Sequence, residues 1–183
     1  MTFRLPTALR DNDDARCVTA LRTYFHGAPG REPSLGRHFD TWGTRVDNAY
    51  TSDDVVAVAF LSVNVASEAV TQLIADPPAS LTDALAHPDS ADRDLVEVDV
   101  DDITPDWAPW RLWTQVRALP GVGPTTASKL LARKRPRLLP IWDTVAATVI
   151  GPSEGFWQGL AAALKAIDRD LHHRLLRLHR EAE

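Results

Sequence analysis

Cysteine is almost absent from this chain of 183 residues, because Cys17 is the only one. A single cysteine excludes an intrachain disulfide, a four-cysteine zinc site and an iron–sulfur cluster held by cysteines. Long apolar runs are missing as well, and no stretch approaches the roughly 18 apolar residues that a membrane helix needs. The first residues contain no apolar signal core. We therefore expect a cytoplasmic protein that holds no metal and contacts no membrane.

Acidic residues are missing from one segment of an otherwise acidic chain of net charge −5. Residues 1–110 carry 8 basic and 19 acidic residues, whereas residues 111–183 carry 12 and 6. Between Arg111 and Trp142 there are seven basic residues and no acid. A local basic surface attracts a polyanion whatever the total charge, because salt screens charges more than about 8–10 Å away. A solvated helix face is the ordinary explanation of a charge run that stands alone.

Strand-like alternation is scarce, and most of the chain has the pattern of helices between turns marked by proline and glycine. Asp13 or Asp14 caps a helix that ends near Gly27. Residues 92–106 alternate like a strand, but their many acids favour an exposed connection. The sequence predicts an all-α protein with one domain, residues 1–183. Its N-terminal part (1–110) is acidic and its C-terminal part (111–183) is basic.

Glycine is also uncommon, yet two of the nine glycines flank one valine in the turn LPGVG, residues 119–123. Both glycines can take a positive φ without a Cβ clash, and Pro124 suits the first position of the next helix. Such a turn exposes the backbone amides of residues 121–123 and of the helix start, which together can bind one phosphate. A turn that only reverses the chain is the simpler interpretation.

The longer stretch LPGVGPTTA is followed by Asp143 in PIWDTVA, 20 residues after Gly123. This combination, over about residues 113–151, resembles the helix-hairpin-helix motif of the HhH-GPD superfamily of base-excision DNA glycosylases. The resemblance implies a helix-hairpin-helix, glycosylase-like helical bundle that binds double-stranded DNA, flips a nucleotide and hydrolyses its N-glycosidic bond. The segment ASKLLARKRPRLLP also looks like that of a poorly characterised bacterial family of unknown function.

The chain departs from that superfamily at two positions of the motif. Thr125 stands where the bifunctional members carry a catalytic lysine, so no Schiff base can form there. Val145 replaces the histidine that usually follows the aspartate. The resemblance therefore implies either a monofunctional glycosylase that uses water or a non-catalytic DNA-binding module. An interaction protein whose acidic part mimics nucleic acid, or guards against it, is a third hypothesis.

The resemblance assigns roles to residues at and after the turn. Asp143 is the candidate catalytic carboxylate, although capping of a helix explains its position as well. Trp142 can form the wall of a base pocket, and core packing is its other explanation. No cofactor is expected, with a monovalent cation at the hairpin left open. The expected phosphate-binding residues are Gly121, Val122, Gly123, Thr125, Thr126, Lys129, Arg133, Lys134, Arg135 and Arg137.

Other aromatic and polar residues are assigned by their spacing. Three tryptophans lie at helical apolar spacing and are predicted to be core residues, namely Trp110, Trp113 and Trp157. A pocket in front of Asp143 would also need polar residues from the N-terminal part, for which the candidates are His38, Asp40 and Trp42.

Overall fold

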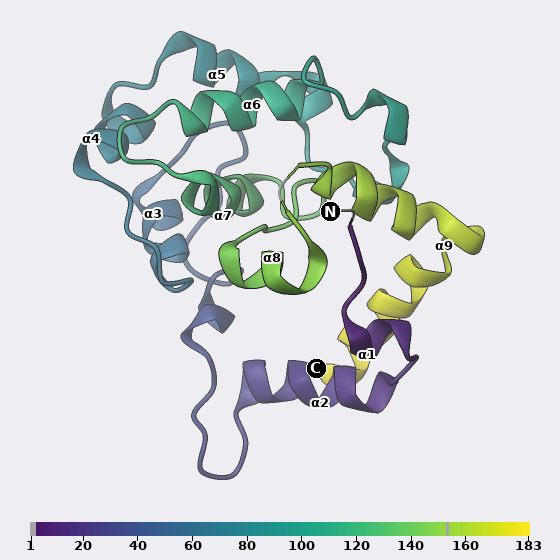
Figure 1. Cartoon of the computed structure of the whole chain (residues 1–183). Helices are drawn as coiled ribbons and strands as arrows, with labels where there is room; N and C mark the ends of the chain where they lie inside the picture. Colours follow the sequence, from purple (N-terminus) through teal and green to yellow (C-terminus); the bar gives the residue numbers. More distant parts are fainter. Residues whose placement is uncertain (1–2, 153) are drawn as a thin grey trace.

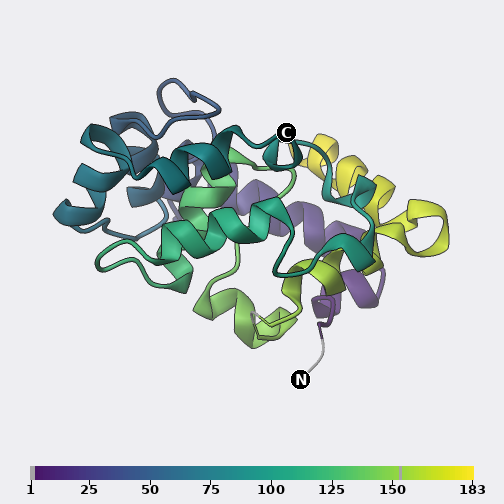
Figure 2. The ribbon, with the colours of Figure 1, turned by 90° about the horizontal axis from the view of Figure 1, so that it is seen from above.

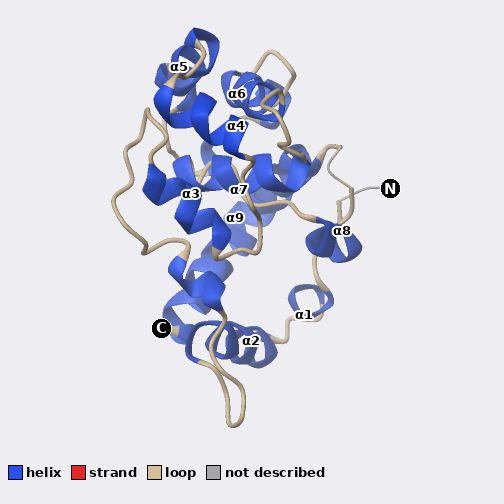
Figure 3. Ribbon diagram, turned by 90° about the vertical axis from the view of Figure 1, so that its left-hand side faces the viewer, coloured by secondary structure: helices blue, strands red, loops and turns tan. Residues whose placement is uncertain are grey.

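Helices make up the regular structure of this chain. The computed structural model describes residues 3–152 and 154–183. In these ranges there is no strand, apart from an isolated bridge between Ala28 and Arg31, so the prediction of an all-α fold is confirmed (Figure 3). The helices are α1 (Thr7–Arg10), α2 (Asp14–His26), α3 (Ser52–Ala59), α4 (Ser67–Val70), α5 (Ala79–Ala86), α6 (Ala108–Arg117), α7 (Pro124–Lys134), α8 (Thr144–Ile150) and α9 (Phe156–Ala182) (Figure 1). Helix α9 is kinked, because the backbone from Ala166 to Arg169 is not helical.

Several helices begin and end at local signals in the sequence. Asp13 caps α2, because its side chain accepts a hydrogen bond from the backbone N–H of Arg16. The helix ends at Gly27, whose φ of 81° suits a residue without a Cβ. Thr51 and Asp54 form a capping box at the start of α3. The predicted beginning and end of α2 are therefore confirmed.

Helix α7 is at the centre of the main core. Its residues Ala127, Leu130 and Leu131 are completely buried, and the helix packs against both α3 and α6. Helix α5 lies along α6 on the outer side (Figures 1 and 2). Among the described residues, no helix is both long enough and apolar enough to cross a membrane. The core thus fixes α6 and α7 relative to each other, and with them the turn that joins them.

Residues 92–106 differ from the prediction of an exposed connection. Leu95, Val96 and Val98 are each only 2% exposed, and they belong to the main core. The segment forms two short 3₁₀ turns, η4 (Leu95–Glu97) and η5 (Val100–Asp102). The apolar residues of the alternating pattern therefore face the core, although the backbone of this segment is not a strand.

Three of the expected phosphate-binding side chains are buried instead. Arg133, Lys134 and Arg135 are 3%, 0% and 1% exposed, respectively, at the end of α7. A cation that is removed from water is costly unless it is paired and hydrogen-bonded. The prediction that these three residues bind phosphate is wrong, because their charged groups are enclosed by the protein itself.

The carboxylate of Asp54 is the anionic partner of this cluster. Its Oδ1 lies 3.2 Å from Nε of Arg133, and its Oδ2 accepts a hydrogen bond from Nζ of Lys134. Asp54 is itself completely buried in α3. Burial lowers the pKa of Lys134, and the hydrogen bond to Asp54 opposes that effect. We refer to Asp54, Arg133, Lys134 and Arg135 as the buried ion cluster.

The buried ion cluster also holds the irregular segment 39–48. Arg133 donates to the carbonyl of Phe39 (2.8 Å), and Lys134 donates to that of Val46 (2.8 Å). Arg135 donates to the carbonyl of Asp47 (2.6 Å). These backbone carbonyls have no partners in a regular helix or sheet, so the end of α7 satisfies them.

The N-terminal helices form a separate layer with the end of α9 (Figures 1 and 3). A small apolar cluster joins Val18 of α2 to Leu178 and Ala182 of α9. Asp14 accepts hydrogen bonds from Nε of Arg174 (2.7 Å) and Nη2 of Arg177 (2.8 Å). Hydrogen bonds from these two arginines lower the pKa of Asp14 below its ordinary value of 3.8.

The first prediction concerns the buried ion cluster. Asp54→Asn is expected to lower the free energy of unfolding by about 3–5 kcal/mol, because Arg133 and Lys134 lose the negative charge that compensates them. Denaturant unfolding at pH 7 measures this change. The exposed Asp83 of α5 provides the control, since Asp83→Asn should stay within about 0.5 kcal/mol of the wild type. A loss no larger than that of the control would contradict the account of the cluster.

The second prediction concerns pH. Because the pKa of Asp14 is lowered by folding, its stabilisation is complete above pH 3.8 and is lost as the pH falls through the lower folded-state pKa. Asp14→Asn should therefore reduce the acid-side fall of the melting temperature below about pH 4, whereas Asp83→Asn should not. Thermal unfolding of the wild type and both variants between pH 2 and pH 6 measures this fall of the melting temperature. An unchanged acid-side slope in Asp14→Asn would refute the assignment.

Candidate functional site

The turn between α6 and α7 has the expected left-handed backbone at one of its two glycines. Gly121 has a φ of 70°, whereas Gly123 has a φ of −83° and is extended. The prediction of a positive φ is therefore wrong for Gly123. A Cβ on Gly121 would lie 2.9 Å from that of Ala66, but one on Gly123 would meet nothing within 4 Å. The backbone at Gly123 is thus open to approach from solvent.

The start of α7 carries no side-chain cap. Pro124 has no amide hydrogen, and the N–H groups of Thr125 and Thr126 lie in the first turn, where no carbonyl of the helix can accept them. The helix dipole adds a partial positive charge at the same end. An anion could bind at such a helix start, and the phosphate-binding role of the turn stays a prediction.

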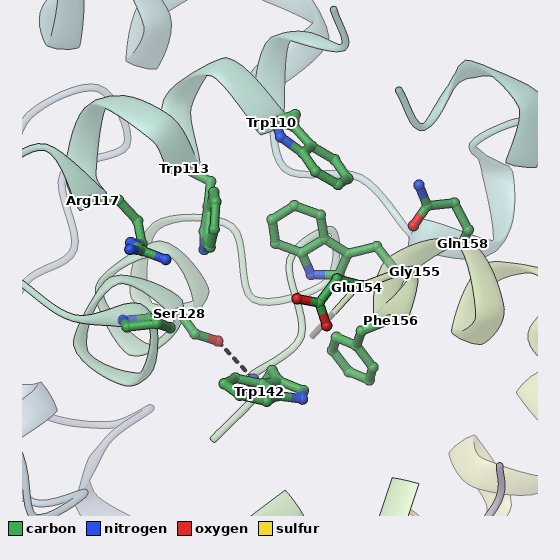
Figure 4. Close-up of a pocket in the computed structure, with 11 residues that line it drawn as sticks. Trp110, Trp113, Arg117, Ser128, Trp142, Glu154, Gly155, Phe156 and Gln158 are labelled. Atoms are coloured by element: carbon green, nitrogen blue, oxygen red, sulfur yellow. Dashed lines mark hydrogen bonds between the residues drawn. The ribbon is translucent and has the colours of Figure 1, made fainter. Parts of the chain in front are cut away.

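A cavity of about 240 Å³ opens beside this helix start (Figure 4). It lies between α6, α7, the segment that precedes α8, and the first turn of α9. Pro124 and Ser128 of α7 contribute to its lining. Its aromatic walls are Trp110, Trp113, Trp142, Phe156 and Trp157, and we call it the tryptophan pocket.

Contacts among the rings and with the backbone fix these walls. Trp157 meets Trp110 and Trp113 edge-on, with ring centres 5.6 and 6.2 Å apart. Trp142 is held by its backbone N–H, which donates to Oγ of Ser128 (2.6 Å; dashed in Figure 4). Its indole N–H donates to the carbonyl of Gly151 (3.1 Å). Trp142 therefore does form a pocket wall. The three tryptophans that we expected in the core line the same pocket: Trp157 belongs to the main core, and Trp110 and Trp113 are partly buried and pack against it.

Polar groups accompany the aromatic walls. The guanidinium of Arg117 lies 5.0 Å from the ring centre of Trp113, which is a cation–π distance. The carboxylate of Glu154 reaches the pocket from the segment before α9 (Figure 4). Trp157 Nε1 and Gln158 Oε1 are buried without a hydrogen-bond partner among the described residues. A flat apolar surface with hydrogen-bonding groups at its edges suits a heteroaromatic ring.

Asp143 lies beside the tryptophan pocket and is not one of its lining residues. Its Oδ1 accepts a hydrogen bond from the N–H of Ala146 (2.7 Å), and this contact caps α8. Its Oδ2 lies 3.5 Å from Nζ of Lys129, and 24% of its side chain is exposed. The capping role is confirmed, and the catalytic role stays a prediction.

The remaining basic candidates are also occupied by protein groups. Lys129 is 7% exposed and donates to the carbonyl of Leu61 (2.8 Å), so its phosphate-binding role is wrong in this structure. Arg137 is exposed but lies 3.7 Å from both Asp92 and Asp94. Arg117 was not among the predicted phosphate-binding residues, but its exposed side chain lines the tryptophan pocket.

The polar candidates of the N-terminal part do not join the tryptophan pocket. Asp40 lines a second cavity of about 310 Å³, in which burial raises its pKa. The rings of His38 and Trp42 pack against Phe60, with centres 5.3 and 5.1 Å away. The predicted convergence of these residues in front of Asp143 is thus not seen in the described part of the chain.

Sequence reasoning missed the polar residues of the tryptophan pocket. Arg117 follows Trp113 by one helical turn, and this spacing places the two side chains on one face of a helix. Ser128 follows Pro124 by the same interval. Glu154 lies in a turn and has no such periodic signal. The first two could have been found by extending the tryptophan face along α6 and α7.

Metal ligation and relatedness complete the description of the site. Within the described ranges, no group of three or more His, Cys, Asp or Glu side chains is placed to hold a metal ion. The monovalent cation at the hairpin stays a prediction.

No curated protein and no solved structure matches this chain. Residues 17–183, which include the hairpin and the whole pocket, match the family of unknown function DUF6308. The chain therefore belongs to the DUF6308 family.

Proposed function

We propose that this protein binds DNA by taking one nucleobase into the tryptophan pocket. The observation that carries the proposal is a cavity with five aromatic walls next to an uncapped helix start. Stacking of a base on an aromatic side chain contributes about 1–3 kcal/mol. The N–H groups at the start of α7 are suited to the phosphate of the same nucleotide.

The size of the tryptophan pocket supports a single base as its occupant. A volume of about 240 Å³ is below that of sites for drug-sized ligands, which begin near 300 Å³. A base inside a duplex is covered on both faces, so it enters such a pocket only from a flipped or unpaired position. The two helices α6 and α7, joined by a turn with a left-handed Gly121, support the helix-hairpin-helix, glycosylase-like interpretation.

We expect base stacking to contribute more to the free energy of DNA binding than phosphate contacts do. Four of the expected phosphate-binding cations are buried, namely Lys129, Arg133, Lys134 and Arg135. The affinity should accordingly depend only weakly on salt, because each phosphate contact contributes about 0.9 to the slope of log K against log salt.

The third prediction tests the pocket. Trp142→Ala should weaken binding of a single-stranded oligonucleotide about tenfold to a hundredfold, because it removes one stacking surface. Trp42→Ala removes a tryptophan that is 41% exposed and lies outside the pocket, and it should leave binding unchanged. Fluorescence anisotropy with labelled DNA measures both variants.

Melting temperatures of both variants show whether they remain folded. If folded Trp142→Ala binds as well as Trp42→Ala does, the tryptophan pocket is not the site of base binding.

Hydrolysis of the N-glycosidic bond of the bound nucleotide is the second candidate function. Asp143 directly follows the pocket residue Trp142 and keeps 24% of its side chain exposed, and this placement favours it. A carboxylate there can stabilise an oxocarbenium-like centre and orient water. Thr125 offers no amine, so the proposed enzyme is monofunctional.

The fourth prediction separates this chemistry from stability. Asn is about as good a helix cap as Asp, so Asp143→Asn should lose less than about 1 kcal/mol of stability. Base release should fall by about 10²–10⁴, because the anion near the developing positive charge is gone. Single-turnover release from a panel of lesion-bearing duplexes measures the rate.

The two proteins give distinguishable outcomes in that assay. Equal release by both would leave Asp143 with a capping role only. If both bind DNA and neither releases a base, the non-catalytic DNA-binding module is the better description.

A further inference from the structure

Two side chains of opposite charge line the tryptophan pocket, and they come from different elements. Arg117 approaches from the end of α6, with its guanidinium over the ring of Trp113. Glu154 approaches from the segment before α9, and Figure 4 shows the two charged groups on different sides of the space above Trp142. Both residues are exposed, so their charged groups can reach a ligand that the pocket holds.

The two groups make different demands on a ligand. A guanidinium presents its N–H donors as a planar fork, which matches two neighbouring acceptors in the plane of a ring. An ionised carboxylate only accepts, and its two oxygens match two neighbouring N–H donors. The complementary ligand is a flat ring with an acceptor pair on one edge and a donor pair on another.

Among the bases of DNA, guanine has this pattern. Its N7 and O6 are neighbouring acceptors, and its N1–H and N2–H₂ are neighbouring donors. Adenine carries a donor, N6–H₂, where guanine has O6, so Arg117 would meet a like group. A quaternary ammonium ligand, the other usual occupant of aromatic walls, is disfavoured because the cation of Arg117 already lies over Trp113.

We propose that the tryptophan pocket selects guanine, with Glu154 accepting from N1–H and N2–H₂ and Arg117 donating to O6 and N7. The proposal rests on the proposed function, in which the pocket takes a nucleobase, and it adds the identity of that base. A guanine in a DNA strand and a free guanine nucleotide carry the same edges. The two sources are separated by the experiment.

The experiment is a calorimetric titration of the protein with GMP, IMP and AMP. IMP lacks only the N2 amino group, so it isolates one of the two donors that Glu154 accepts. GMP should bind about tenfold more tightly than IMP and AMP, because one paired set of hydrogen bonds to a base edge discriminates by that order. Glu154→Gln should remove the difference between GMP and IMP. The exposed Glu32 lies outside the pocket, and Glu32→Gln should preserve the difference.

A second arm uses oligothymidylates that carry one central guanine, hypoxanthine or adenine. Preference for guanine in both arms supports the proposal with a free nucleotide as a sufficient ligand. Preference only in the strands supports it with DNA as the source.

Two results would overturn the proposal. If the wild type binds all bases within twofold, or if Glu154→Gln keeps the preference, guanine selection is wrong while base binding stands. If no nucleotide and no strand binds at all, this inference and the proposed function fail together.

Discussion

The carboxylate of Asp54, enclosed between Arg133 and Lys134, determines how α7 sits in this molecule. Buried charges are stable only when they are paired, so the last turn of α7 must face α3 and the segment 39–48. With that end fixed, the rest of a rigid helix has no freedom to rotate. Its first turns then place Pro124 and Ser128 beside the tryptophan pocket. One helix thus organises the fold at its C-terminal end and the candidate site at its N-terminal end.

The local parts of the fold could be predicted from the sequence, because capping is decided within a few residues. The helix from Asp14 to His26 follows from Asp13 and Gly27 in this way. The basic run on α7 could not be interpreted in the same manner. Its partners are Asp54, which is 79 residues away from Arg133, and backbone carbonyls that leave no mark in a sequence. The same run of basic residues is compatible with an exposed phosphate-binding face and with a buried structural cluster.

The candidate site was predictable to a similar extent. Helical spacing places Trp110 and Trp113 on one face of α6, but spacing alone does not say whether that face meets the core or a cavity. The place of Trp142 next to Asp143 is compatible with a pocket wall and with core packing, and the residue lines the pocket while it packs against the core. The convergence of four elements on one cavity is a tertiary property. Only this tertiary arrangement brings Glu154 to the cavity. Because four of the predicted phosphate-binding cations are buried, our proposal rests on base stacking more than on phosphate contacts.

The most direct test of the central claim, that the tryptophan pocket binds a nucleobase, is an NMR titration of the six indole N–H groups with a short single-stranded oligonucleotide. The account predicts that the indole signals of Trp110, Trp113, Trp142 and Trp157 shift together and saturate with one affinity. The signal of Trp42, outside the pocket, should stay in place. Saturable shifts confined to Trp42, or binding of the oligonucleotide with the four pocket signals unmoved, would contradict the account.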